Sequence, residues 1–112
     1  MIKLKQKIPQ VGSKIYKYEI IENTIKCDFE KTLVDFIITV DGILKFGYGH
    51  YKLSNKAEYV KYAGRAKIVN GKIIYIDTDS GHYVPTEEEM INAKEILNKM
   101  NLISDDIKLF VV

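Results

Sequence analysis

The sequence predicts an α+β fold, in which a curved antiparallel sheet, or a partial barrel, of about six or seven strands is covered by one C-terminal amphipathic helix. Runs of β-branched and aromatic residues fill most of the chain, and the turn dipeptides Asp41-Gly42 and Asn70-Gly71 separate neighbouring runs. A single helical pattern stands near the end. With 112 residues, 46% of them hydrophobic, we expect one domain, 1–112, that buries its own core.

Composition and charge narrow the class of protein. The formal net charge is +2, which by itself indicates neither a nucleic-acid partner nor a membrane surface. The chain contains no run of about 18 apolar residues and no apolar leader after Met1, so we expect neither a membrane span nor a signal peptide. Cys27 is the single cysteine, which excludes an internal disulfide. We therefore expect a cytoplasmic protein without a metal or a cofactor.

Strand patterns dominate the first half of the chain. Residues 1–10 are basic and weakly patterned, which indicates an arm or a short edge strand. Glu22-Asn23 and Asp41-Gly42 are expected to be tight turns between strands. The segment before Asp41 is almost entirely apolar, so we expect it to be covered on both faces. The strands predicted here are 14–21, 24–29, 33–40 and 43–46.

The second half continues with a polar loop at 52–56 and a long strand at 58–69. Gly64 inside that strand indicates a bulge or a close backbone approach. Asn70-Gly71 then turns the chain into a strand at 72–77.

A helix is predicted at residues 86–100. Thr86 is a good N-cap and Glu89 follows three residues later, which is the capping-box spacing. Asn101 can end the helix in a left-handed conformation. The last strand, 107–112, runs from Ile107 to Val112 with apolar residues on both faces, so we expect it to insert between strands or to be covered by a second copy in a homo-oligomer.

The segment 80–86, Ser80-Gly81-His82-Tyr83-Val84-Pro85-Thr86, joins the strands to the helix and is the main candidate site. Gly81 permits a turn, and Pro85 favours extended backbone at Val84. His82 and Tyr83 are not needed for such a connection.

The N-terminus of a helix can hold an anion, to which His82 could add a hydrogen-bond donor or a proton. The acidic residues at 87–89 would repel a phosphate on the helix axis. His82 is therefore either a binding or catalytic group, or a buried structural histidine.

A second cluster, Tyr48, His50 and Tyr51, follows the strand at 43–46. It is either a ring-lined pocket for a planar ligand or a set of rings packed on the sheet. If this strand and the strand at 72–77 are neighbours, His50 and His82 share one rim. Arg65, the single arginine, either clamps an anionic ligand or pairs with a carboxylate of the protein.

Residues from about Phe36 onward resemble the C-terminal domain of the plant IQ-motif (IQM) calmodulin-binding proteins and a related C-terminal module of bacterial polymorphic toxins and effectors. In that pattern, a His and two serines precede an Ala-Ala-Gly step, and a Ser-Gly-His-Tyr-x-Pro-Ser/Thr motif opens the last helix. Segment 80–86 matches in full, whereas the first motif matches at His50 alone and the small-residue step occurs at Ala63-Gly64. The resemblance implies the fold and a site near His82.

We expect a binding module for a small anionic or nucleotide-like molecule. Its candidate ligand-binding residues are Tyr48, His50, Tyr51, Arg65, Ser80, Gly81, His82 and Tyr83. Such a protein could be phage-borne or mobile and sequester a host signalling molecule. The alternatives are a toxin-type enzyme domain with His82 as general acid or base, and a protein-interaction module.

Overall fold

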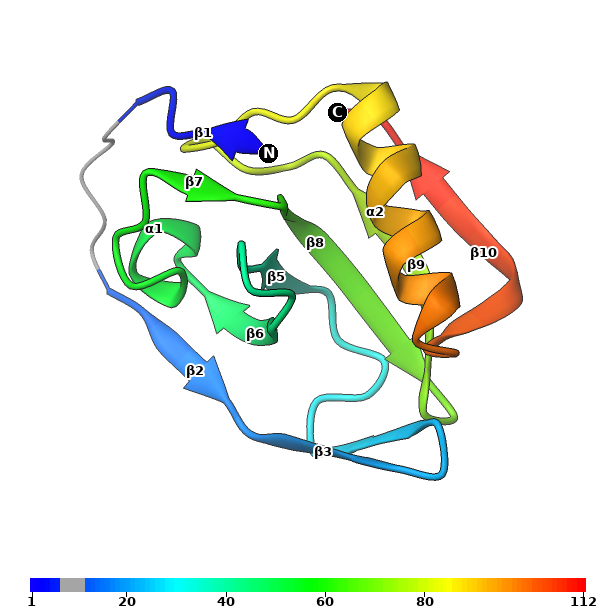
Figure 1. Cartoon of the computed structure of the whole chain (residues 1–112). Helices are drawn as coiled ribbons and strands as arrows, with labels where there is room; N and C mark the ends of the chain where they lie inside the picture. Colours follow the sequence, from blue (N-terminus) through cyan, green and yellow to red (C-terminus); the bar gives the residue numbers. More distant parts are fainter. Residues whose placement is uncertain (7–11) are drawn as a thin grey trace.

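The computed structural model describes residues 1–6 and 12–112 and confirms the α+β class (Figure 1). This part of the chain forms ten strands and two helices. The strands are β1 (Ile2–Lys3), β2 (Lys14–Tyr16), β3 (Tyr18–Ile21), β4 (Thr24–Cys27), β5 (Val34–Ile38), β6 (Leu44–Tyr48), β7 (Tyr59–Val60), β8 (Tyr62–Val69), β9 (Lys72–Asp77) and β10 (Ile103–Phe110), and the helices are α1 (His50–Leu53) and α2 (Glu87–Lys99).

Six strands form the main sheet in the order β10-β9-β8-β5-β6-β2, and its edges are β10 and β2. Two smaller pairs, β1 with β7 and β3 with β4, lie outside it. Neighbours are antiparallel except β9 and β10, which are parallel. Strands β9 and β10 are parallel because α2, which connects them, carries the chain back to the end of the sheet at which β9 starts. The sheet is therefore open and mixed.

Three predicted strands have different limits in the structure. The segment 14–21 divides at Lys17, where the chain passes from the main sheet (β2) to the small β3–β4 pair. The segment 58–69 divides in the same way at Lys61. The last strand begins at Ile103 and lies at the edge of the sheet, so the prediction that it inserts between strands is wrong. Of the predicted arm, residues 7–10 lie outside the described residues.

Two of the three predicted turns are two-residue hairpins. Glu22 and Asn23 both have positive φ (50° and 61°), and so do Asn70 and Gly71 (52° and 76°). The turn at Asp41-Gly42 is longer, because the Thr39 N–H donates to the Ile43 carbonyl around three residues. Only Gly42 has positive φ there.

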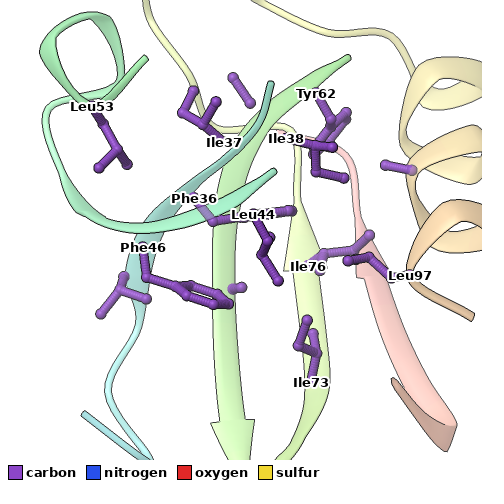
Figure 2. Close-up of a cluster of buried hydrophobic side chains, with 14 of the residues drawn as sticks. Phe36, Ile37, Ile38, Leu44, Phe46, Leu53, Tyr62, Ile73, Ile76 and Leu97 are labelled. Carbon is purple, nitrogen blue, oxygen red and sulfur yellow. The ribbon is translucent and has the colours of Figure 1, made fainter. Parts of the chain in front are cut away.

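The core covers both faces of β5, as predicted, because the consecutive residues Phe36, Ile37 and Ile38 are all buried, and α2 packs on one of these faces. Figure 2 shows Phe36, Phe46 and Tyr62 from the sheet in one cluster with Leu97 of α2. Alternate residues of a strand share a face, so the apolar residues at every second position meet there. Helix α2 contributes the buried face predicted from its spacing, namely Met90, Ala93 and Leu97.

Gly64 marks a close backbone approach and not a bulge. It lies in regular register opposite Phe36. A Cβ atom at this position would overlap with the carbonyl oxygen of Asp77. The bulge lies further along, where the β8–β9 register shifts between Lys67 and Ile68, and β10 is irregular between Ile103 and Lys108.

Candidate functional site

Helix α1 is a single turn that the sequence did not reveal, since its second half falls in the predicted polar loop 52–56. It begins after Gly49, whose φ of 87° redirects the chain from the end of β6. Leu53 is buried and anchors the turn to the domain. Helix α1 therefore holds His50 and Tyr51 in fixed positions.

His50 braces α1 against the sheet. Its side chain is buried, and its Nε2 lies 2.6 Å from the carbonyl oxygen of Gly64 in β8. A carbonyl oxygen only accepts, so Nε2 carries the hydrogen. The Nδ1 atom lies 3.6 Å from Oδ2 of Asp35, and the same oxygen accepts the Gly49 N–H at 2.8 Å.

Tyr83 is the buried anchor of the segment 80–86. Its hydroxyl donates to the Ala57 carbonyl at 2.7 Å and lies 2.8 Å from Oγ of Ser54, which also reaches the Tyr51 carbonyl at 2.8 Å. The hydroxyl groups of Ser54 and Tyr83 each carry one hydrogen, so two hydrogens are shared among these three contacts. Burial raises the pKa of Tyr83, which keeps the phenol protonated. No sequence pattern pointed to Ser54, which is the C-cap of α1.

Tyr51 and His82 bring the two predicted clusters together. Their rings stack with centroids 5.6 Å apart and an interplanar angle of 17°. His82 is buried, whereas Tyr51 is partly exposed. The strands at 43–46 and 72–77, whose adjacency was the condition for a shared rim, are not neighbours, because β5 and β8 lie between β6 and β9. Tyr51 and His82 are in contact because α1, which follows β6, lies next to segment 80–86.

Arg65 is held by the buried carboxylate of Asp77. Its Nε and Nη2 atoms each lie 2.9 Å from Oδ2 of Asp77, and Nε lies 3.3 Å from Oδ2 of Asp79. Burial opposes the charged guanidinium, but the hydrogen bond and charge of Asp77 outweigh burial and raise the pKa of Arg65. The Arg65 side chain still keeps 32% of its surface exposed.

Sequence reasoning also missed the structural role of Asp77. Oδ1 accepts the backbone N–H groups of Arg65 and Asp79, and Oδ2 also accepts the hydroxyl of Tyr75. Its own carbonyl accepts the Tyr62 hydroxyl. At the end of β9, the Asp77 carboxylate therefore accepts backbone N–H groups in place of a strand carbonyl. The chain leaves the sheet at this point and enters the loop toward residue 80.

The N-terminal segment, residues 1–6, ties down the other side of the same loop. The backbone N–H of Lys5 donates to the His82 carbonyl at 2.8 Å, and its ammonium group donates to the carbonyls of Tyr83 and Val84. The side-chain amide of Gln6 donates to the Gly81 carbonyl. The carbonyls of residues 81–84 thus all accept hydrogen bonds from Lys5 and Gln6.

Val84 departs from the expected conformation. Its φ is 43°, in the left-handed region, whereas Pro85 led us to expect extended backbone. This region is costly for a β-branched side chain. The hydrogen bonds to residues 81–84 and the bond from the Val84 N–H to the Ser80 carbonyl hold it there.

Other predictions concern the margins of this region. Tyr48 is exposed at the end of β6 opposite Lys14. The predicted capping box forms at the start of α2, where the Glu89 N–H donates to the Thr86 hydroxyl and the Thr86 N–H donates to the Glu89 carboxylate. An anion at that helix end is therefore disfavoured.

Three further features bear on the kind of site, namely metal-binding groups, membrane-spanning helices and other cavities. No group of three or more His, Cys, Asp or Glu side chains that could hold a metal occurs within residues 1–6 and 12–112. No helix in this part of the chain is long and apolar enough to cross a membrane. A shallow cavity of about 760 Å³ lies elsewhere, between β2, β3 and β4.

Contacts thus join His50 and Tyr51 of α1 to segment 80–83 and, through Gly64, to the strand that carries Arg65. Comparison of the chain with protein-family models, curated proteins and solved structures yields no match.

Proposed function

We propose that the protein binds a small planar ligand with negative charge on the surface formed by α1, Arg65 and the loop after Asp77. The Tyr51–His82 stack is the observation on which the proposal rests. A partly exposed ring held by a buried neighbour offers a surface on which another flat molecule can stack.

Arg65 supplies the charge in this proposal. A chain of contacts links it to the stack, because Gly64 accepts from His50 and His50 precedes Tyr51 in α1. Asp77 and Asp79 hold the guanidinium in one orientation, so little side-chain entropy is lost when it meets an anionic group. A nucleotide-like ligand would combine the ring and the charge that these two groups recognise.

The resemblance to the IQM C-terminal domain and to toxin modules supports the same location, since its most complete motif is segment 80–86. A phage-borne or mobile protein that sequesters a host signalling molecule in the cytoplasm is the biological form of the proposal.

Native mass spectrometry of the protein purified gently from cells tests the proposal. We expect an additional discrete mass on the native chain, and we expect Tyr51→Ala and His82→Ala to lose it. Tyr59→Ala is the matched control, because Tyr59 is an exposed tyrosine of β7. A bare chain in every sample, or an adduct that both site variants retain, would refute the proposal.

Catalysis is the second candidate, and the His50–Asp35 pair favours it. A carboxylate 3.6 Å from a ring nitrogen can orient a histidine that transfers protons. In this version His82 acts as general acid or base, and His50, whose ring nitrogens face Gly64 and Asp35, has a positioning role. The test is growth arrest on expression, abolished in His82→Ala and in His50→Gln while the purified variants still fold.

Protein interaction through residues 107–112 is the third candidate. Phe110, Val111 and Val112 are exposed at the edge formed by β10. Light scattering should then show a dimer that becomes a monomer in Phe110→Lys. The charged residues of β10, Asp105, Asp106 and Lys108, reduce this tendency, because charges on an edge strand oppose pairing.

A further inference from the structure

A cavity of about 360 Å³ opens in the sheet away from α1, between β8, β9 and β10. Its lining residues are Lys67, Ile74, Tyr75, Asp106 and Lys108. Three of them form a row across the sheet, because Tyr75 pairs in register with Lys67 on one side and with Lys108 on the other. An aromatic ring is thus flanked by two ammonium groups.

Two strand irregularities coincide at this cavity. The β8–β9 register shifts next to Tyr75, which leaves Ile74 as the additional residue of β9. Strand β10 is irregular over the adjoining stretch, between Ile103 and Lys108. Such irregularities interrupt regular pairing and redirect side chains, which is why they often accompany binding sites.

The side chains of the row differ in how they are fixed. The Tyr75 hydroxyl donates to the buried carboxylate of Asp77 at 2.9 Å, so the ring has one orientation. Within the described residues, neither Lys67 nor Lys108 forms an ion pair. Two ammonium groups and the single carboxylate of Asp106 leave the lining with a net charge of +1.

We propose that this cavity is a binding site for a small oxyanion, with Lys67 and Lys108 donating to it from two sides. A group attached to the anion would contact the Tyr75 ring and Ile74. A doubly charged phosphate gains more from two ammonium groups than a carboxylate does, so we expect aryl phosphates to bind best. Asp106 opposes binding by its like charge.

This site is separate from the one formed by α1 and segment 80–84. Its lining residues come from β8, β9 and β10 and do not include Tyr51 or His82. The two sites share Asp77, whose Oδ2 contacts both Tyr75 and Arg65, so the control variants below are needed to tell them apart.

Titration of the ¹⁵N-labelled chain with phenyl phosphate, inorganic phosphate and acetate tests the inference. Saturable amide shifts should occur at Lys67, Tyr75 and Lys108, with affinity falling in the order in which the three probes are named. Lys67→Gln and Lys108→Gln should each raise the Kd for phenyl phosphate about tenfold. Asp106→Asn should lower it about threefold, because a repelling charge is removed.

Two controls give the result its meaning. Lys45→Gln, on β6, and Tyr51→Ala should leave the Kd unchanged. The spectra themselves report whether each variant is folded. Absence of saturation with all three probes, an affinity in both lysine variants equal to that of the native chain, or shifts centred on Tyr51 and His82 would each overturn the inference.

Discussion

Asp77 illustrates, at the scale of one residue, how a buried charge joins a strand to a loop. Asp77→Asn replaces an oxygen that accepts hydrogen bonds with an amide that donates them, facing Arg65 and Tyr75. We expect a loss of about 3–5 kcal/mol in the free energy of unfolding, as when one partner of a buried pair is removed. Urea denaturation of the native and variant proteins measures this difference in the free energy of unfolding.

Asp79→Asn is the matched comparison for that change. Asp79 contacts the same arginine, but its side chain is 47% exposed, and ion pairs in water contribute little. We expect a loss below about 1 kcal/mol. Equal losses in the two variants would show that the buried carboxylate has no special role.

Gly64→Ala tests the close approach of β8 and β9. The added Cβ would overlap with the Asp77 carbonyl oxygen and lie 2.9 Å from the Tyr62 ring. Overpacking of this kind costs about 1–3 kcal/mol, measured as a lower midpoint of chemical unfolding. At Gly12, a Cβ would meet, among the described residues, the side chain of Tyr48 at 3.4 Å, so Gly12→Ala should change stability by less than about 0.5 kcal/mol.

Val84→Asn should stabilise the protein. Asparagine tolerates the left-handed region better than valine, and the Val84 side chain is exposed, so little packing is lost. We expect a gain of about 1 kcal/mol, seen as a higher thermal midpoint. A decrease would mean that the loop depends on the valine side chain itself.

Helix α2, at the scale of elements, owes its start to Thr86. Thr86→Ala removes the oxygen that accepts the Glu89 N–H and should cost about 0.5–2 kcal/mol by chemical denaturation. Thr32→Ala, at an exposed threonine before β5, should cost much less. If the two costs are the same, the capping box contributes nothing measurable to stability.

Elements with strong local patterns were predictable from the sequence, whereas short or displaced ones were not. The hairpin at Asn70-Gly71 and the helix after Thr86 follow from residue type alone. Helix α1 escaped because a single turn is too short to show a period. The start of β10 escaped because Ser104-Asp105-Asp106 has the composition of a turn, although it lies within the strand.

At the scale of the whole molecule, the candidate site was predictable in part. Segment 80–86 and His50 were singled out by residue type, and the structure places them around α1. Their partners were hidden, because Asp77 is 12 residues from Arg65 and only the strand register brings the two together. Side chains that complete a polar network through sheet pairing leave no local signal.

The stability of the whole domain should fall at alkaline pH. Burial, and next the nearby charge of Asp77, raise the pKa of Tyr62, and burial also raises that of Tyr83. The unfolded chain ionises near the ordinary tyrosine value of about 10. The stabilisation is therefore complete below that pH and is lost as the pH rises toward the folded pKa values.

Urea midpoints measured from about pH 8 to about pH 11 check this expectation. Tyr62→Phe removes one of the two buried phenols, so its urea midpoint should fall less steeply as the pH rises over this range. Its midpoint at about pH 8 should already be lower than that of the native chain, because the hydrogen bond to the Asp77 carbonyl is lost. Tyr59→Phe, at an exposed tyrosine, should keep the native slope. Parallel slopes in all three proteins would contradict the burial argument.

The contact between the first residues and the loop at 81–84 has a consequence for biosynthesis. Lys5 leaves the ribosome early but bonds to residues 78 and 79 positions later in the chain. At about 5–20 residues per second, roughly 4–16 s pass before those partners are made. Ile2, buried in the finished domain, is exposed during that interval, so nascent chains that stall before residue 84 present an uncovered apolar end to chaperones.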